Sequence, residues 1–118
     1  MVALRLTRSA EEDLRRILAD SLADYGATGL ERYRTLIGVA LGDLSADGAP
    51  PGSRDRPELG DGLRSYHLML CRRRGAIDGQ AVRRPRHVLV YRPGPEELVV
   101  LRILHDAMEL SRHLPGWT

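Results

Sequence analysis

The chain has 118 residues, 42% of them hydrophobic and 29% charged, and its net charge is +2. This length suits a single domain over residues 1–118, and the composition is that of a soluble globular protein rather than a disordered one. No apolar run approaches the ~20 residues of a membrane span, so we expect a cytoplasmic protein. Cys71 is the only cysteine, which excludes an internal disulfide and a site built from several thiolates.

Charge is distributed unevenly along the chain. Residues 9–31 contain six acidic residues and two arginines, whereas residues 63–92 contain eight arginines and one aspartate. Lysine is absent, so every fixed positive charge is a guanidinium, which suits paired contacts with phosphate or carboxylate groups. A bias in genome composition would remove lysine equally well, but the segregation still predicts a basic surface in the second half.

A strand and two helices are predicted in the first 45 residues. Alternating apolar residues predict a half-buried strand over 2–7. Ser9 and Glu12 have the spacing of a capping box, and apolar residues three and four apart then predict a helix over 9–25. A second apolar stripe predicts a helix over 29–45, and the short link between the helices favours an antiparallel helical hairpin.

The remainder of the chain predicts a sheet. Residues 45–62 are rich in glycine and proline and predict a surface loop with no regular element. Three further strands are predicted over 63–72, 86–92 and 97–104, and a short C-terminal helix over 106–114. Between the first two of these strands lies a segment with several arginines, residues 73–85, which we call the basic arm.

These elements predict an α+β fold of two layers, in which an antiparallel sheet packs against the helical hairpin. In the last strand, Val99, Leu101 and Ile103 share one face, and Arg102 lies on the other. We therefore expect the face without the charge to meet the helices.

Three short motifs resemble the ParE branch of the RelE/ParE toxins of type II toxin–antitoxin systems. They are LRSYH at 63–67, RHVLVYR at 86–92 and LRILHD at 101–106. Members of that family share the strand, helical hairpin and three-strand layout, with an arginine near the start of the second strand, "YR" closing the third and "R-(V/I)-L-H" closing the fourth. The matching residues are Arg64, Tyr91, Arg92, Arg102 and His105. Many members carry an arginine shortly after the "LH" pair, whereas Asp106-Ala107-Met108 follow it here, and the basic arm is longer than in compact members.

The resemblance implies a toxin that acts on one of two targets. If the chain acts as ParE toxins do, it inhibits DNA gyrase by binding, which needs no catalysis. If it acts as RelE toxins do, it cleaves mRNA on the ribosome, and the candidate catalytic residues are then His105, Arg102 and Tyr91. Cleavage requires a group that moves a proton, and arginine, with a pKa above ~12, cannot do so. Because His105 is the main candidate and the lysines and late tyrosine typical of ribonuclease members are absent, the sequence favours gyrase. A third reading is a non-toxic relative that only binds an antitoxin.

The resemblance also implies a ParD-type antitoxin partner whose C-terminal segment folds against the toxin. We expect it to cover apolar residues that remain partly exposed beside the hairpin, and to place acids against arginines of the sheet. The predicted antitoxin-binding residues are Leu18, Leu22, Tyr25, Tyr33, Arg64, Arg92 and Arg102. The predicted target-binding residues are Arg72, Arg73, Arg74, Arg83 and Arg84. Nucleic acid would be contacted only through gyrase or the antitoxin complex, and no cofactor or metal is expected. His67, His87 and His113 are interpreted as structural or solvent-facing.

Overall fold

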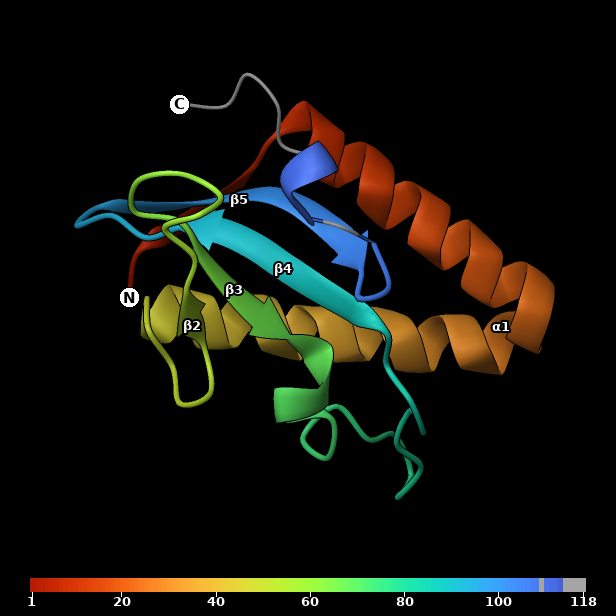
Figure 1. Ribbon diagram of the computed structural model, residues 1–118. Helices are drawn as coiled ribbons and strands as arrows, with labels where there is room; N and C mark the ends of the chain where they lie inside the picture. Colours follow the sequence, from red (N-terminus) through yellow and green to blue (C-terminus); the bar gives the residue numbers. More distant parts are fainter. Residues whose placement is uncertain (109, 114–118) are drawn as a thin grey trace.

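The computed structural model describes residues 1–108 and 110–113 and has the predicted α+β architecture of two layers (Figure 1). Its elements, in chain order, are β1 (Ala3–Leu6), α1 (Arg8–Ala46), β2 (Arg54–Asp55), β3 (Arg64–His67), the 3-10 helix η1 (Leu68–Cys71), β4 (His87–Arg92), β5 (Glu97–His105) and the 3-10 helix η2 (Leu110–His113). In the described part of the chain the strands form one five-stranded sheet in the order β1-β5-β4-β3-β2. None of the helices in this part is both long and apolar enough to cross a membrane.

The helical hairpin is confirmed, and its two helices are the two halves of α1. The helix turns back on itself at Gly26, whose φ of 74° and ψ of −171° are not helical (Figure 1). Glycine adopts this left-handed φ without the steric cost that a Cβ would add. The start of the helix differs from the prediction, because Thr7 rather than Ser9 caps it by accepting a hydrogen bond from the amide of Ala10 at 3.1 Å.

The sheet is mixed rather than antiparallel throughout. β1 pairs with β5 in parallel, Ala3 opposite Glu97 and Leu6 opposite Val100, whereas the other pairs are antiparallel. The strand predicted over 2–7 was expected to belong to an antiparallel sheet, and this was wrong. Alternation predicts which face of a strand is buried but not the direction in which the strand runs. The short strand β2 also lies in the segment expected to hold no element, since two exposed polar residues give no alternation to detect.

Two predicted elements have different bounds. The strand expected over 63–72 ends at His67, whose Nδ1 accepts a hydrogen bond from the amide of Met69 at 3.0 Å and caps η1. Leu68 and Cys71 are buried and three residues apart, which is the repeat of a 3-10 helix rather than a strand. The helix expected over 106–114 is the shorter η2, and residues 109 and 114 lie outside the described part.

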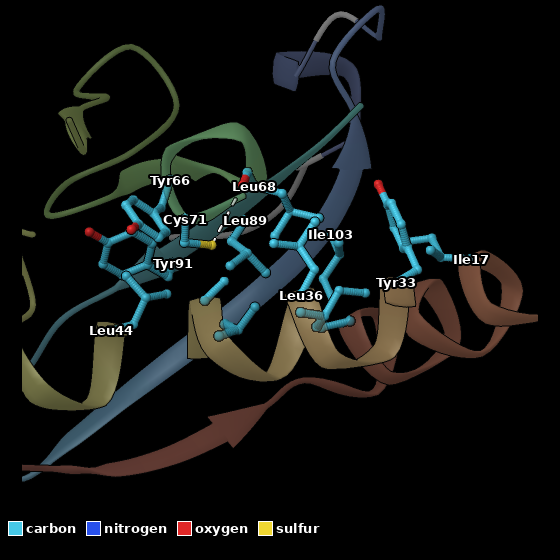
Figure 2. Close-up of a cluster of buried hydrophobic side chains, with 14 of the residues drawn as sticks. Ile17, Tyr33, Leu36, Leu44, Tyr66, Leu68, Cys71, Leu89, Tyr91 and Ile103 are labelled. Atoms are coloured by element: carbon cyan, nitrogen blue, oxygen red, sulfur yellow. Dashed lines mark hydrogen bonds between the residues drawn. The ribbon is translucent and has the colours of Figure 1, made fainter. Parts of the chain in front are cut away.

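The main core lies between the hairpin and the sheet. Figure 2 shows it extending from Ile17 and Tyr33 at one end to Tyr66, Tyr91 and Leu44 at the other. A second apolar cluster lies on the helix-free face of the sheet, and Leu59 and Leu110 pack against it.

A β-bulge in β5 changes which residues face the helices. Val90 pairs with Arg102 and Tyr91 with Val100, so Leu101 is an extra residue without an opposite partner. The residues packed under the hairpin are Leu98, Val100 and Ile103, and those on the helix-free face are Val99, Leu101 and Leu104. The predicted face was therefore wrong for Val99 and Leu101, because strict alternation cannot continue through an inserted residue.

Candidate functional site

The basic arm is a closed loop with an ordered tip. At its base, Arg72 Nε donates hydrogen bonds to the carbonyl oxygens of Val82 at 2.6 Å and Arg83 at 3.2 Å. At its tip, Asp78 and Gly79 have φ values of 51° and 77°, the left-handed pair that a tight hairpin turn requires. The arm leaves η1, turns and returns to β4 (Figure 1). It thus has a defined shape although it contains no long strand.

An ion pair fixes the arm to α1. Arg74 donates through Nη1 and Nη2 to Asp43 Oδ1 and Oδ2 at 2.6 and 2.5 Å, and the Tyr66 hydroxyl donates to the same carboxylate at 2.8 Å. The hydrogen bonds from Arg74 hold the pKa of Asp43 below its ordinary value. Beside this pair, Gly75 lies so close to α1 that a Cβ there would be 2.9 Å from Leu36 Cα. The root of the arm is therefore held against the hairpin.

The predicted target-binding arginines consequently fall into two groups. The guanidinium groups of Arg72 and Arg74 form hydrogen bonds within the chain, and these bonds shape and anchor the arm. Arg73, Arg83 and Arg84 are exposed and form no ion pair with the rest of the described chain. Only the second group presents guanidinium groups that an external phosphate or carboxylate can bind.

A groove of about 890 Å³ lies between α1 and the arm. One wall of the groove is formed by the two halves of α1 on either side of Gly26. The other wall is formed by the basic arm and the start of β4, and His105 contributes from the end of β5. The lining residues are Ile17, Asp20, Ser21, Asp24, Tyr25, Thr28, Gly29, Arg32, Tyr33, Gln80, Ala81, Val82, Arg83, Arg84, Arg86, His87 and His105.

The apolar residues predicted to bind the antitoxin are placed differently from one another. Tyr25, with 77% of its surface exposed, lines the groove, and Leu22 is 49% exposed near the same turn without lining it. Leu18 is half-buried. Tyr33 also lines the groove, but it is only 9% exposed, so the expectation that it stays partly exposed was wrong. Its burial results from a hydrogen-bonded contact with the base of the arm.

His87, at the start of β4, lines the groove and contacts Tyr33. The Tyr33 hydroxyl lies 2.5 Å from His87 Nδ1 and accepts a hydrogen bond from the Arg86 amide at 3.3 Å. Burial, with the nearby His105 as a second cause, lowers the pKa of His87 to about 4, and burial raises the pKa of Tyr33 to about 12. At neutral pH both groups are therefore uncharged, and the tyrosine can donate to an unprotonated ring nitrogen.

Asp106 joins three segments next to this histidine. Its carboxylate accepts hydrogen bonds from His67 Nε2 at 3.0 Å and from Arg86 Nε at 3.0 and 3.2 Å. Burial alone would raise the pKa of Asp106, but the bonds from His67 and Arg86 outweigh it and the pKa is lowered. His105 Nδ1 is 3.6 Å from the same carboxylate and accepts a hydrogen bond from the Ala107 amide at 3.1 Å. Sequence reasoning missed this cluster, because the individual histidines were its only signal.

A smaller pocket of about 380 Å³ lies on the helix-free face of the sheet. It is lined by Gly52, Arg54, Arg56, Glu58, Leu59, Ser65, His67, Val88, Asp106, Met108 and Leu110. Arg56 Nη1 is 3.6 Å from Glu58, and its Nε is buried without a hydrogen-bond partner. Sequence reasoning missed Arg54 and Arg56 because they lie in the segment read as a featureless loop.

Residues 4–110 match the family described as the ParE toxin of the type II toxin–antitoxin system parDE. The chain belongs to the ParE toxin family. It is thus a ParE-type toxin of a type II toxin–antitoxin module. No curated protein sequence matches it.

Solved structures share the fold of this ParE-family chain. A chain from the chromosomal ParDE toxin–antitoxin system of P. aeruginosa has a TM-score of 0.62 and 21% identity, covering 89% of this chain and 96% of that one. A copper-bound mutant toxin from Helicobacter pylori has a TM-score of 0.56 and 19% identity, covering 91% and 97%. Copper is a property of that structure. In residues 1–108 and 110–113 of this chain, no three His, Cys, Asp or Glu side chains are grouped so as to hold a metal ion.

The ParE-family fold does not bring the three candidate ribonuclease residues together. His105 pairs with His87 at one end of β4, whereas Tyr91 lies four residues further along that strand, roughly 13 Å away. The Tyr91 hydroxyl is also occupied, since it donates to the Gly48 carbonyl oxygen at 2.8 Å. Arg102 is bound to Asp13 on α1, with its Nε 2.7 Å from Oδ2.

The sheet arginines predicted to bind the antitoxin lie apart from the groove of this ParE-type toxin. Arg64 forms an ion pair with Asp55 and donates to Ser53 Oγ at 2.7 Å, and its strand partner Tyr91 is at the far end of β4. Arg92 closes that same end and is half-buried. The predicted antitoxin residues are therefore divided: the hairpin set lies beside the groove, Arg64 and Arg92 lie at the opposite end of the sheet, and Arg102 is bound to Asp13 on α1.

Proposed function

We propose that this toxin inhibits DNA gyrase by binding it, and that a ParD-type antitoxin neutralises the toxin by occupying the groove between α1 and the basic arm. The observation that carries this proposal is the groove itself, where an exposed tyrosine faces arginines that have no ion-pair partner in the described chain. Membership in the ParE toxin family and the fold shared with a chain from a ParDE system support the antitoxin as partner.

The groove has the chemistry that an amphipathic helix uses to bind a protein. Such a helix inserts apolar side chains into a groove and keeps its polar side toward the rim. Tyr25 offers a large apolar surface that is 77% exposed, and Val82 lies on the opposite wall. Arg83 and Arg84 at the rim suit acidic side chains, because a guanidinium binds a carboxylate through paired hydrogen bonds.

Arginines of the arm are also the residues best suited to contact the target. Arg73, Arg83 and Arg84 project from an arm that is anchored at its root, so their positions are restricted before any partner binds. Gyrase carries bound DNA, and three guanidinium groups on one arm suit contacts with its phosphates or with acidic residues of the enzyme. Binding alone would stop gyrase, so no catalytic residue is required.

A supercoiling assay with purified gyrase tests the proposal. The wild-type chain is expected to inhibit supercoiling, and an equimolar amount of its cognate ParD-type antitoxin is expected to restore it. Replacing Arg73, Arg83 and Arg84 by alanine should relieve inhibition at least tenfold, as expected for the loss of several charged contacts. A control in which Arg8, Arg15 and Arg16 become alanine removes the same charge from exposed positions of α1. No inhibition by wild-type protein would refute the proposed target.

The second candidate function, mRNA cleavage on the ribosome, is favoured by the pocket on the helix-free face. There His67, hydrogen-bonded to Asp106, lies with Arg54 and Arg56, so a group able to move a proton shares a pocket with groups able to hold negative charge. A translating extract separates the two functions. Cleavage by wild-type protein that is lost in His67→Ala would support the ribonuclease, and an intact message would count against it.

A further inference from the structure

We propose that the antitoxin neutralises this toxin by covering Arg83 and Arg84, so that antitoxin and target compete for the same two arginines. This inference rests on the proposed function and adds how the site is regulated. Both residues line the groove assigned to the antitoxin, and both are exposed arginines of the arm assigned to the target. A segment lying in the groove therefore occupies the charges that the target needs.

The arm has one side toward the groove and one side away from it. Arg83 and Arg84 belong to the groove side, whereas Arg73, which is equally exposed, does not line the groove. The turn at Asp78 and Gly79 separates the two stretches. The competition is thus confined to the returning half of the arm, and Arg73 remains accessible when the groove is filled.

The arm cannot swing aside to serve both partners at once, because both of its ends are fixed. The outgoing end is held by the ion pair of Arg74 with Asp43. The returning end is held where the Arg86 amide donates to the Tyr33 hydroxyl at 3.3 Å and where Arg72 Nε donates to the Val82 carbonyl oxygen at 2.6 Å. Arg83 and Arg84 lie between these last two fixed points, so a bound segment and a bound target would collide there.

The charges of the groove define which segment fits it. The arm wall carries Arg83 and Arg84, and Arg32 adds a third guanidinium without an ion-pair partner in the described chain. The α1 wall carries the carboxylates of Asp20 and Asp24. The complementary occupant is a helix whose acidic side faces the arm and whose basic or neutral side faces α1. We assign this occupant to the C-terminal segment of the antitoxin.

Two variants separate competition from independent binding. The probe is the C-terminal half of the cognate ParD-type antitoxin, and its Kd for the toxin is measured by titration calorimetry. Replacing Arg83 and Arg84 by alanine should weaken binding about tenfold or more and should also reduce growth arrest when the toxin is expressed alone. Arg73→Ala should leave the Kd within about twofold while still reducing growth arrest. Growth arrest is used because it does not depend on the identity of the target.

Each outcome decides between the claims. If the probe does not bind the wild-type chain, the proposed function fails together with this inference. If the probe binds wild type and the Arg83/Arg84 double variant equally, the inference alone fails and the antitoxin partnership stands. A complex of toxin, antitoxin segment and gyrase that forms at stoichiometric ratio would also overturn competition. Thermal unfolding of every variant, expected to match wild type because these arginines are exposed, excludes misfolding as the cause.

Discussion

Asp13 on α1 binds Arg102 on β5 through two hydrogen bonds, from Nε at 2.7 Å and Nη2 at 2.9 Å, and accepts a third from the Ile103 amide at 3.0 Å. β1 ends at Leu6, so beyond that point β5 has no strand on this side, and the carboxylate takes the place of a strand partner. The pair raises the pKa of Arg102 and joins the first helix to the last strand. Arg102, which belongs to the family motif, therefore has a structural role in this chain.

The first prediction is that Asp13→Ala lowers the free energy of unfolding by about 3 kcal/mol, because it leaves a partly buried guanidinium and a strand amide without an acceptor. Urea denaturation at pH 7 measures the loss. Glu97→Ala, which breaks the exposed pair with Arg5, is the control and should cost less than about 1 kcal/mol. Equal effects of the two variants would show that the Asp13 pair adds nothing to stability.

The second prediction concerns acid sensitivity through His87. Burial and the neighbouring His105 lower its pKa from 6.5 to about 4, so between these values the unfolded chain binds a proton that the folded chain does not. Stability should therefore fall as the pH is lowered from 6.5 to 4. The other groups facing His87 are Tyr33, which stays neutral, the carboxylates of Asp20 and Asp106, and His67.

Urea denaturation across this pH range, together with an NMR titration of the His87 ring, checks the acid sensitivity. His87→Asn, which keeps an acceptor for Tyr33 but cannot titrate, should flatten the dependence. Asp43 and Asp106 also have lowered pKa values, but their ordinary value is 3.8, so the stability that they contribute is lost mainly below that pH. An NMR pKa of His87 near 6.5 would contradict the assigned neutral state.

The third prediction compares a glycine of the basic arm, Gly75, with a glycine of α1, Gly38. Gly75→Ala should destabilise the chain by about 1–3 kcal/mol, because the added methyl group would lie 2.9 Å from the backbone of Leu36. Gly38→Ala should instead stabilise it by about 0.5–1 kcal/mol, since this exposed position of α1 has open space around it. Thermal unfolding measures both shifts, and a stabilising Gly75→Ala would mean that the arm does not pack against α1.

The fourth prediction is that Arg74→Ala loosens the arm without unfolding the protein. The variant removes the bidentate pair with Asp43 but leaves the hydrogen bond from Tyr66 to that carboxylate. Amide hydrogen exchange over residues 72–86 should become faster, whereas the free energy of unfolding should change by less than about 1 kcal/mol because Arg74 is exposed. Unchanged exchange in the arm would show that other contacts hold it.

The order of the elements could be predicted because helices and strands repeat their apolar residues at different intervals. The direction of β1 and the bulge at Leu101 could not, since both depend on which strand lies alongside. One inserted residue moved Val99 and Leu101 to the helix-free face. The helical turn at Gly26 was predictable, because glycine tolerates a left-handed φ that residues with a Cβ rarely adopt.

The candidate site was less accessible from the sequence. His67, His87 and Asp106 are far apart along the chain and meet only through the register of β3, β4 and β5. The excess of arginine in the arm was visible, but no sequence pattern separates Arg72 and Arg74, which bond internally, from the exposed pair at 83 and 84. That division depends on hydrogen bonds to a carbonyl and a carboxylate in distant segments.

Hydrogen–deuterium exchange of the toxin with and without its antitoxin locates the antitoxin on the toxin surface. Protection is expected at residues 21–33 and 80–87, the two walls of the groove around Tyr25 and Arg83. Protection confined to residues 54–67, 106–108 and 110, on the helix-free face, would show that the antitoxin binds at the smaller pocket and not in the groove.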